Sequence, residues 1–207
     1  CDGSVLAFVS SLGVNVCREK NCHQISIEQC HPIDAAVSSN GKFMAVVCGN
    51  GSVVWWNVRK NKVVRKFESA VSSPKVVHLQ IDDTDQFVQL WTADGYRYLW
   101  NVESGELDDK PWRGAIGKQV VCSSDLECAA TYTEMEILIS NRDGTENTRL
   151  PVYNNRITRM AMSDDGHELV CTDGVCVFGW NLSTKKKFGP FKSETFINDV
   201  AIHGKMV

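Results

Sequence analysis

The sequence has no continuous apolar run of the roughly 18 to 20 residues that a helix needs to cross a bilayer. Its start also lacks the basic, apolar and small-residue succession of a secretory signal peptide. We therefore expect no membrane partner. Because the chain begins with Cys1 rather than Met, we expect it to begin inside a longer gene product.

Neither sign of charge dominates the sequence. The 22 basic and 25 acidic side chains leave a formal net charge of −3, whereas domains that grip phosphate backbones carry a strong basic excess. Nucleic acid is therefore not the favoured partner. The one basic cluster, Lys185 to Lys187 with Lys192 nearby, is interpreted as a solvated outer turn, with a weak contact to RNA or an acidic partner as the alternative.

Patterns typical of catalysis and of cofactor binding are missing as well. None of the five histidines combines with a nucleophile in a Gly-x-Ser-x-Gly or Cys/His signature. The sequence GAIGK at 114–118 lacks the spacing of a phosphate-binding loop, and no helical pattern follows it. We therefore expect no enzymatic activity, no cofactor and no metal.

The sequence repeats itself with a period of 40 to 44 residues. Two sequence features recur at nearly the same spacing, so the evidence for the repeat does not depend on either feature alone. The first feature is an asparagine that ends an apolar run, at Asn57, Asn101, Asn141 and Asn181. The second is an apolar run followed by a polar turn, at 33–37, 76–80, 118–122, 158–162 and 198–202.

Within one unit the pattern predicts short strands and turns. Over 33–67 the runs IDAAVSS, KFMAVVC, SVVWWNV and KVVRKF are separated at Asn40-Gly41, at Asn50-Gly51 and near Lys60-Asn61. Asn-Gly between such runs predicts a hairpin turn with positive φ at both residues. No window has apolar residues at helical spacing. Four strands per repeat of this length predict an all-β chain of four-stranded β-propeller blades.

The order of these features resembles the WD-repeat propeller family, with Asn in place of the usual Asp after Trp. The Gly-His pair that often opens such a repeat is missing, and the unit at 118–156 has no Trp. The hydrogen-bonded His, Ser/Thr, Asp and Trp network of that family is therefore not carried over. The predicted blade units are 1–32, 33–75, 76–117, 118–156 and 157–197, with a closing first strand at 198–207.

The five units either close as a five-bladed ring or form part of a seven-bladed ring. We favour the seven-bladed ring, because both ends of the chain look like cuts within a repeat. A strand from one terminus that completes the blade begun at the other would remove the exposed sheet edges.

The six tryptophans fall into two groups. Trp56, Trp100 and Trp180 occupy the repeat position, so we expect structural roles, with each indole packed between blades and its N–H bonded to a turn. The other three lie outside this position. We interpret them as candidates for contact surfaces, where Trp is enriched, with ordinary packing of two of them as the alternative; they are Trp55, Trp91 and Trp112.

The nine cysteines are scattered and odd in number, which is not typical of a small secreted disulfide scaffold. We expect reduced thiols and an intracellular location, in cytoplasm or nucleus. Cys171 and Cys176 flank Asp173-Gly174 and are interpreted as two packed thiols, with a cross-strand bridge as the alternative. A zinc site is a minor alternative for one cluster; it comprises Cys17, Cys22, His23, Cys30 and His31.

The family resemblance implies a peptide-binding face, built from the loops that enter each first strand and from the turns before each Trp strand. The residues at those positions are Asp34, Asn50, His78, Asp94, Glu134, Arg159, Asp173 and Asp199. Their acidic bias predicts a basic partner segment.

These features together predict a non-enzymatic scaffold or adaptor that mediates protein-protein interactions in a larger assembly. Two alternatives stay open. One is the ligand-sensing or autoinhibitory propeller of a multidomain signalling ATPase, which a flanking nucleotide-binding domain would favour. The other is a propeller subunit of an RNA-processing complex, which a steep loss of binding with added salt would favour.

Overall fold

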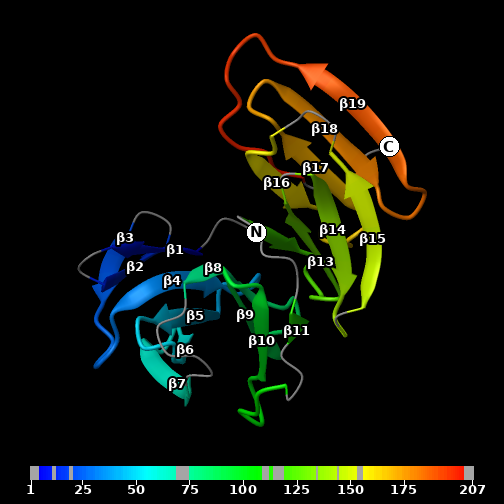
Figure 1. Ribbon diagram of the computed structural model, residues 1–207. Coiled ribbons are helices and arrows are strands. Elements are labelled where there is room, and N and C mark those ends of the chain that lie inside the picture. Colours follow the sequence, from blue (N-terminus) through cyan, green and yellow to red (C-terminus); the bar gives the residue numbers. More distant parts are fainter. Residues whose placement is uncertain are drawn as a thin grey trace. The chain divides into compact units, whose positions relative to one another are not determined.

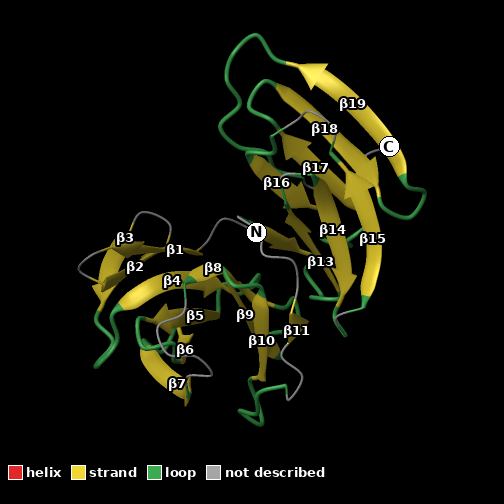
Figure 2. Ribbon diagram, in the orientation of Figure 1, coloured by secondary structure: helices red, strands yellow, loops and turns green. Residues whose placement is uncertain are grey.

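The structure is a computed structural model, and it describes residues 5–10, 13–18, 21–68, 75–108, 112–113, 119–133, 135–143, 145–152 and 156–202. These residues form strands and turns, as the repeat predicts (Figure 2). The part of the chain so described contains no helix, and hence none long and apolar enough to cross a membrane.

The described strands form five sheets, and each sheet consists of strands that follow one another along the chain (Figure 1). Antiparallel neighbours need only tight turns between them. The first sheet has β1 (Val5–Ser10), β2 (Gly13–Arg18) and β3 (Asn21–Ile25). The second has β4 (Pro32–Val37), β5 (Phe43–Cys48), β6 (Val53–Asn57) and β7 (Lys62–Phe67).

The other three sheets have four strands each. The third contains β8 (Val76–Ile81), β9 (Phe87–Thr92), β10 (Tyr96–Asn101) and β11 (Trp112–Arg113). The fourth contains β12 (Val120–Cys122), β13 (Cys128–Tyr132), β14 (Glu136–Asn141) and β15 (Glu146–Pro151). The fifth contains β16 (Arg159–Met162), β17 (Glu168–Thr172), β18 (Cys176–Asn181) and β19 (Lys186–Lys192).

Each sheet falls within one predicted repeat unit, except that β4 begins one residue early, at Pro32. Contacts divide the chain into two compact units, Cys1–Pro111 and Trp112–Val207. Residues 198–202, predicted as part of a closing first strand, are described without a strand. Closure of a ring by this segment therefore stays a prediction.

Neighbouring sheets pack through clusters of buried apolar side chains. In the first unit one cluster joins the first and second sheets, and another joins the second and third. In the second unit a cluster joins the fourth and fifth sheets. The second sheet lies between two such clusters, so consecutive residues of β5 and β6 are buried on both faces. Strands buried on both faces therefore lack the alternation of polar and apolar residues that is typical of a strand with one exposed face.

The two adjacent tryptophans of β6 lie on opposite faces of the second sheet, because successive side chains of a strand alternate. Trp56 belongs to the cluster shared with the first sheet, and Trp55 to the cluster shared with the third. Trp100 and Trp180 are likewise buried in their clusters. The indole N–H of Trp56 has no hydrogen-bond partner, so the expected bond from this ring to a turn is not made.

The prediction that Trp55 and Trp91 form contact surfaces is wrong, because each side chain is only 1% exposed. Trp55 is part of the cluster between the second and third sheets. Trp55 also stacks on Phe43, with 4.9 Å between the ring centroids. The side chain of Trp112 lies outside the described residues, so its role stays a prediction.

The asparagine of the repeated Trp-Asn pair caps the outer turn of its sheet. The side-chain oxygens of Asn57, Asn101 and Asn181 each accept the main-chain N–H three residues ahead, at 2.8, 2.9 and 2.9 Å. Asn side chains commonly stabilise turns in this way. The 40 to 44-residue spacing in the sequence is therefore the spacing of this turn.

The prediction of positive φ at both residues of the Asn-Gly turns is wrong. Gly41 and Gly51 have φ of 65° and 82°, whereas Asn40 and Asn50 are not among the residues with positive φ. The Asn50 side-chain oxygen instead accepts the main-chain N–H of Ser52 at 3.1 Å. This bond stabilises the turn with Asn in an ordinary conformation, so only the glycine needs the left-handed region.

Candidate functional site

Most of the residues selected from the sequence lie at one end of the sheets. In an antiparallel meander, the start of the first strand and the turn between the second and third strands share an end. In the first unit this end carries Asp34 in β4, Asn50 after β5, His78 in β8 and Asp94 after β9. We call it the strand-entry end. Asn50 and Asp94 are exposed, and Asp34 and His78 are half-buried.

Asp34 and His78 interact from the first strands of neighbouring sheets. The register shifts at Pro32/Asp34 and at Val76/His78, and bulges of this kind redirect side chains. Burial lowers the pKa of the His78 imidazole; a hydrogen bond with Gln80, at 3.0 Å, and the Asp34 carboxylate oppose this shift. The structure thus brings together two selected residues that are 44 positions apart in the sequence.

Several of the selected side chains also serve the local main chain. Asp34 and Asp199 each accept the N–H of the next residue, at 2.8 and 2.9 Å. Asp173 accepts the N–H groups two and three residues ahead, at 2.9 and 2.7 Å. These carboxylates therefore stabilise the main chain around them as well as adding negative charge. Asp94 is exposed, and its carboxylate adds to burial in raising the pKa of Tyr98.

In the second unit, Arg159 and Asp173 lie at the strand-entry end of the fifth sheet. Arg159 is exposed and Asp173 is half-buried. Asp199 is exposed and lies outside any strand. Glu134 lies outside the described residues. The selected set is therefore divided between the two units, and each unit presents its own part of it.

The sequence reasoning missed Gln119, which precedes β12 and occupies the second position of the run KQVVC. Asp34 and Arg159 occupy the same position of IDAAV and TRMAM, so the repeat contained the signal. The Gln119 amide donates to the main-chain oxygen of Met160 at 3.2 Å and accepts its N–H at 3.0 Å. This side chain therefore joins the fourth sheet to the fifth.

A cavity of about 500 Å³ lies at the strand-entry end of the second unit. Tyr132, the last residue of β13, forms part of its wall. Four consecutive lining residues, 156–159, lead up to the start of β16. The lining residues are Gln119, Tyr132, Arg156, Ile157, Thr158 and Arg159. Only Arg159 of these was selected from the sequence.

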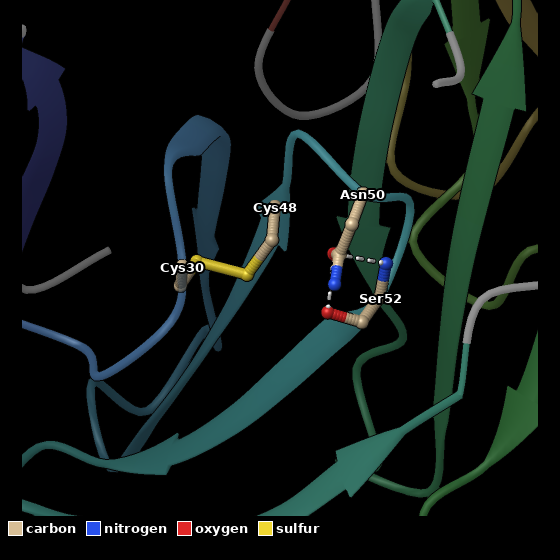
Figure 3. The surroundings of a disulfide bond; sticks show 4 residues. All are labelled: Cys30, Cys48, Asn50 and Ser52. Atoms are coloured by element: carbon tan, nitrogen blue, oxygen red, sulfur yellow. Dashed lines mark hydrogen bonds between the residues drawn. A yellow bond between two sulfur atoms is a disulfide. The ribbon is translucent and has the colours of Figure 1, made fainter. Parts of the chain in front are cut away.

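Four cysteines of the first unit are paired in disulfides, which corrects the expectation of reduced thiols. Cys17 and Cys22 are directly opposite each other in β2 and β3. Cys30 and Cys48 join the segment before β4 to the end of β5 (Figure 3). Both pairings remove thiolates from the zinc alternative. Within the described ranges, no group of three or more His, Cys, Asp or Glu is arranged to hold a metal.

Cys171 and Cys176 are both free, and they do not face each other as predicted. The register places Cys171 opposite Phe178, because the loop between β17 and β18 is longer than two residues. Burial raises the pKa of the Cys171 thiol to about 12, against the opposing charge of Lys187. This thiol is therefore packed and unreactive rather than poised for exchange.

The lysine run spans the last residue of the turn, Lys185, and the first two residues of β19. Lys185 and Lys186 are exposed. Lys187 lies over the rings of Phe178 and Trp180, with Nζ 5.1 and 5.4 Å from their centroids. One of the three ammonium groups is therefore held against the aromatic side chains of its own sheet.

No family model and no curated protein matches the sequence. Among solved structures, a chain in the crystal structure of the mitotic checkpoint complex is similar, with a TM-score of 0.74 and 15% sequence identity. The match covers 94% of this chain and 62% of that chain, so this chain spans less than two thirds of its neighbour.

At 15% identity the likeness shows the fold alone. It supports the all-β arrangement of successive propeller-like sheets that the repeats predict. A closed ring, and the number of its blades, stay predictions.

Proposed function

We propose that the chain is a segment of a WD-repeat β-propeller, part of a seven-bladed ring, that acts as a non-enzymatic scaffold or adaptor. It binds other proteins within a larger assembly in the cytoplasm or nucleus. The similar chain of solved structure belongs to a complex, which supports a role in assembly. Disulfides persist mainly in oxidising compartments, so the two disulfides of the first unit do not support this location.

The observation that carries the proposal is the strand-entry end of the first unit. Asp34 and His78 interact there from neighbouring sheets, and Asp94 stands exposed at a turn of the third sheet. The sheets are held together by apolar clusters on their faces. Loops and strand ends on such a scaffold are free to vary and to present contact residues. The exposed carboxylate of Asp94 and the half-buried carboxylate of Asp34 favour a basic segment as the partner.

Charge reversal at one turn of the third sheet tests this proposal. Asp94→Lys changes the exposed turn at the strand-entry end. Asp83→Lys is the matched control, because Asp83 is an exposed aspartate in the turn at the opposite end of the same sheet. Each tagged variant is used to purify partners from cell extract, and the recovered proteins are quantified by mass spectrometry.

We expect Asp94→Lys to lose partners that the unchanged chain and Asp83→Lys both retain. A loss of about tenfold in recovery corresponds to a modest charge contact. Identical partner sets for all three proteins would rule out the strand-entry end of the first unit as the binding surface. Loss with Asp83→Lys alone would move the surface to the other end of the sheet.

A further inference from the structure

The cavity of the second unit has the dimensions of a binding pocket. Its volume of about 500 Å³ falls within the roughly 300–1,000 Å³ typical of ligand sites. It lies where Gln119 and Met160 join the fourth sheet to the fifth, so its walls come from two sheets that are fixed to each other. A pocket held in this way is largely formed before a ligand arrives.

The lining is positively charged. Arg156 and Arg159 are exposed, and the lining contains no acidic residue among those described. The ion pairs of the described part of the second unit use other arginines, Arg142 and Arg149. One N–H of Arg159 donates to the main-chain oxygen of Thr158 at 2.8 Å. A guanidinium has five N–H donors, so most of the donors of Arg159 remain for a ligand.

The other polar side chains of the cavity are either bonded within the protein or able to donate to a ligand. The Gln119 amide is bonded to Met160, and the Thr158 hydroxyl donates to the main-chain oxygen of Thr172 at 3.1 Å. Burial raises the pKa of Tyr132, while Arg159 and Arg156 lower it. Both guanidinium groups are therefore close enough to act on the Tyr132 hydroxyl, which stays protonated at neutral pH and can donate.

Two arginines and a tyrosine select the ligand by charge and geometry. A planar guanidinium matches a carboxylate or a phosphate with two parallel N–H···O bonds. A cation would be repelled. An apolar ligand would remove water from the guanidinium groups without replacing their hydrogen bonds, which costs free energy. An oxyanion satisfies both the charge and the donors.

We propose that this cavity binds an anionic group of a partner peptide, a carboxylate or a phosphate, through Arg156 and Arg159 with Tyr132 as a third donor. The inference rests on the proposed function, because it assigns the partner chemistry at the strand-entry end of the second unit. That chemistry is opposite to the basic partner that the selected acidic residues predict.

Three synthetic peptide libraries test the site. Each is random around one fixed residue, which is Glu in the first, phosphoserine in the second and Gln in the third. The intact 207-residue chain is compared with Arg156→Ala, Arg159→Ala and the double variant. Lys186→Ala is the matched control, since Lys186 is an exposed cation at the opposite end of the fifth sheet.

We expect the unchanged chain and Lys186→Ala to retain the Glu or the phosphoserine library at least about tenfold better than the Gln library. A preference for Glu assigns a carboxylate, and a preference for phosphoserine assigns a phosphate. Each single arginine variant loses part of the preference, and the double variant loses all of it. Because both arginines are exposed, we expect the variants to unfold at the same urea concentration as the unchanged chain.

Three results would overturn the inference. Equal retention of all three libraries by the unchanged chain contradicts an anion site but leaves peptide binding, and so the proposed function, in place. A preference for acidic peptides that survives in the double variant contradicts the assignment to this cavity. Failure to retain any library above the bare matrix counts against both the inference and the proposed function.

Discussion

The side chain of Gln119 is hydrogen-bonded twice to the main chain of Met160. Its amide N–H donates to the carbonyl oxygen at 3.2 Å, and its amide oxygen accepts the N–H at 3.0 Å. One side chain thereby satisfies both polar groups of a residue in the first strand of the next sheet. The contact holds the two sheets together beside the cavity that carries Arg156 and Arg159.

Gln119→Leu should destabilise the chain by about 1–3 kcal/mol, because it leaves the N–H and the carbonyl oxygen of Met160 without their partner. Gln119→Glu keeps an acceptor for the N–H of Met160, so its stability should lie between that of the unchanged chain and that of Gln119→Leu. Urea unfolding followed by tryptophan fluorescence measures the difference. A Gln119→Leu variant as stable as the unchanged chain would show that the contact contributes nothing.

Gly179→Ala should destabilise the fifth sheet by about 1–3 kcal/mol through overpacking. A Cβ at this position would overlap the main-chain oxygen of Leu169 and the ring of Phe188. Gly49→Ala is the control, because its Cβ would meet only ordinary contacts, the nearest being the His31 oxygen at 3.6 Å. Urea midpoints shifted equally by both substitutions would contradict this account.

Removal of the disulfide Cys30–Cys48 by the paired substitutions Cys30→Ser and Cys48→Ala should cost about 3 kcal/mol, because the bond closes a loop with a sequence separation of 18. Removal of Cys17–Cys22, with a separation of 5, should cost less, about 2 kcal/mol. Unfolding without reductant measures both. Alkylation of the denatured, unreduced chain should leave all four cysteines unlabelled, and labelled cysteines at these positions would show that the bonds do not form.

His78 should make the chain less stable in mild acid. Because its pKa in the folded chain lies below the ordinary value of 6.5, the unfolded chain takes up a proton at a higher pH than the folded chain. Its contribution to stability is therefore complete above about pH 6.5 and is lost as the pH falls toward the lowered pKa. His78→Gln should have a smaller loss of unfolding free energy between pH 7.5 and 5, and equal losses in both chains would contradict the shift.

Most of the fold could be predicted from the sequence because its signals are local. An asparagine such as Asn57 caps a turn with its own side chain, so its spacing reports the length of one sheet wherever the sheet lies. The burial of the Trp55 side chain could not be predicted. It depends on a third sheet whose side chains pack against the second, and no pattern within β6 shows that both faces are covered.

The candidate site was predicted only in part. Asp34 and His78 could be selected by their place in the repeat, but their interaction depends on two bulges that shift the register. The repeat marks the position of Gln119, but its bonds to Met160, 41 residues away, could not be predicted from the sequence. The disulfide Cys30–Cys48 was missed because the approach of the two cysteines depends on how β4 aligns with β5.

Partner binding at the strand-entry end is the central claim, and hydrogen exchange tests it most directly. Exchange is measured by mass spectrometry on the chain alone and with a saturating amount of a partner protein recovered from cell extract. We expect slower exchange at strand entries and at the turns between second and third strands, above all at 32–34, 49–52, 76–78, 93–96 and 156–159. Slower exchange confined to the turns at the opposite end, at 38–43, 82–87, 123–128 and 163–168, would contradict the claim.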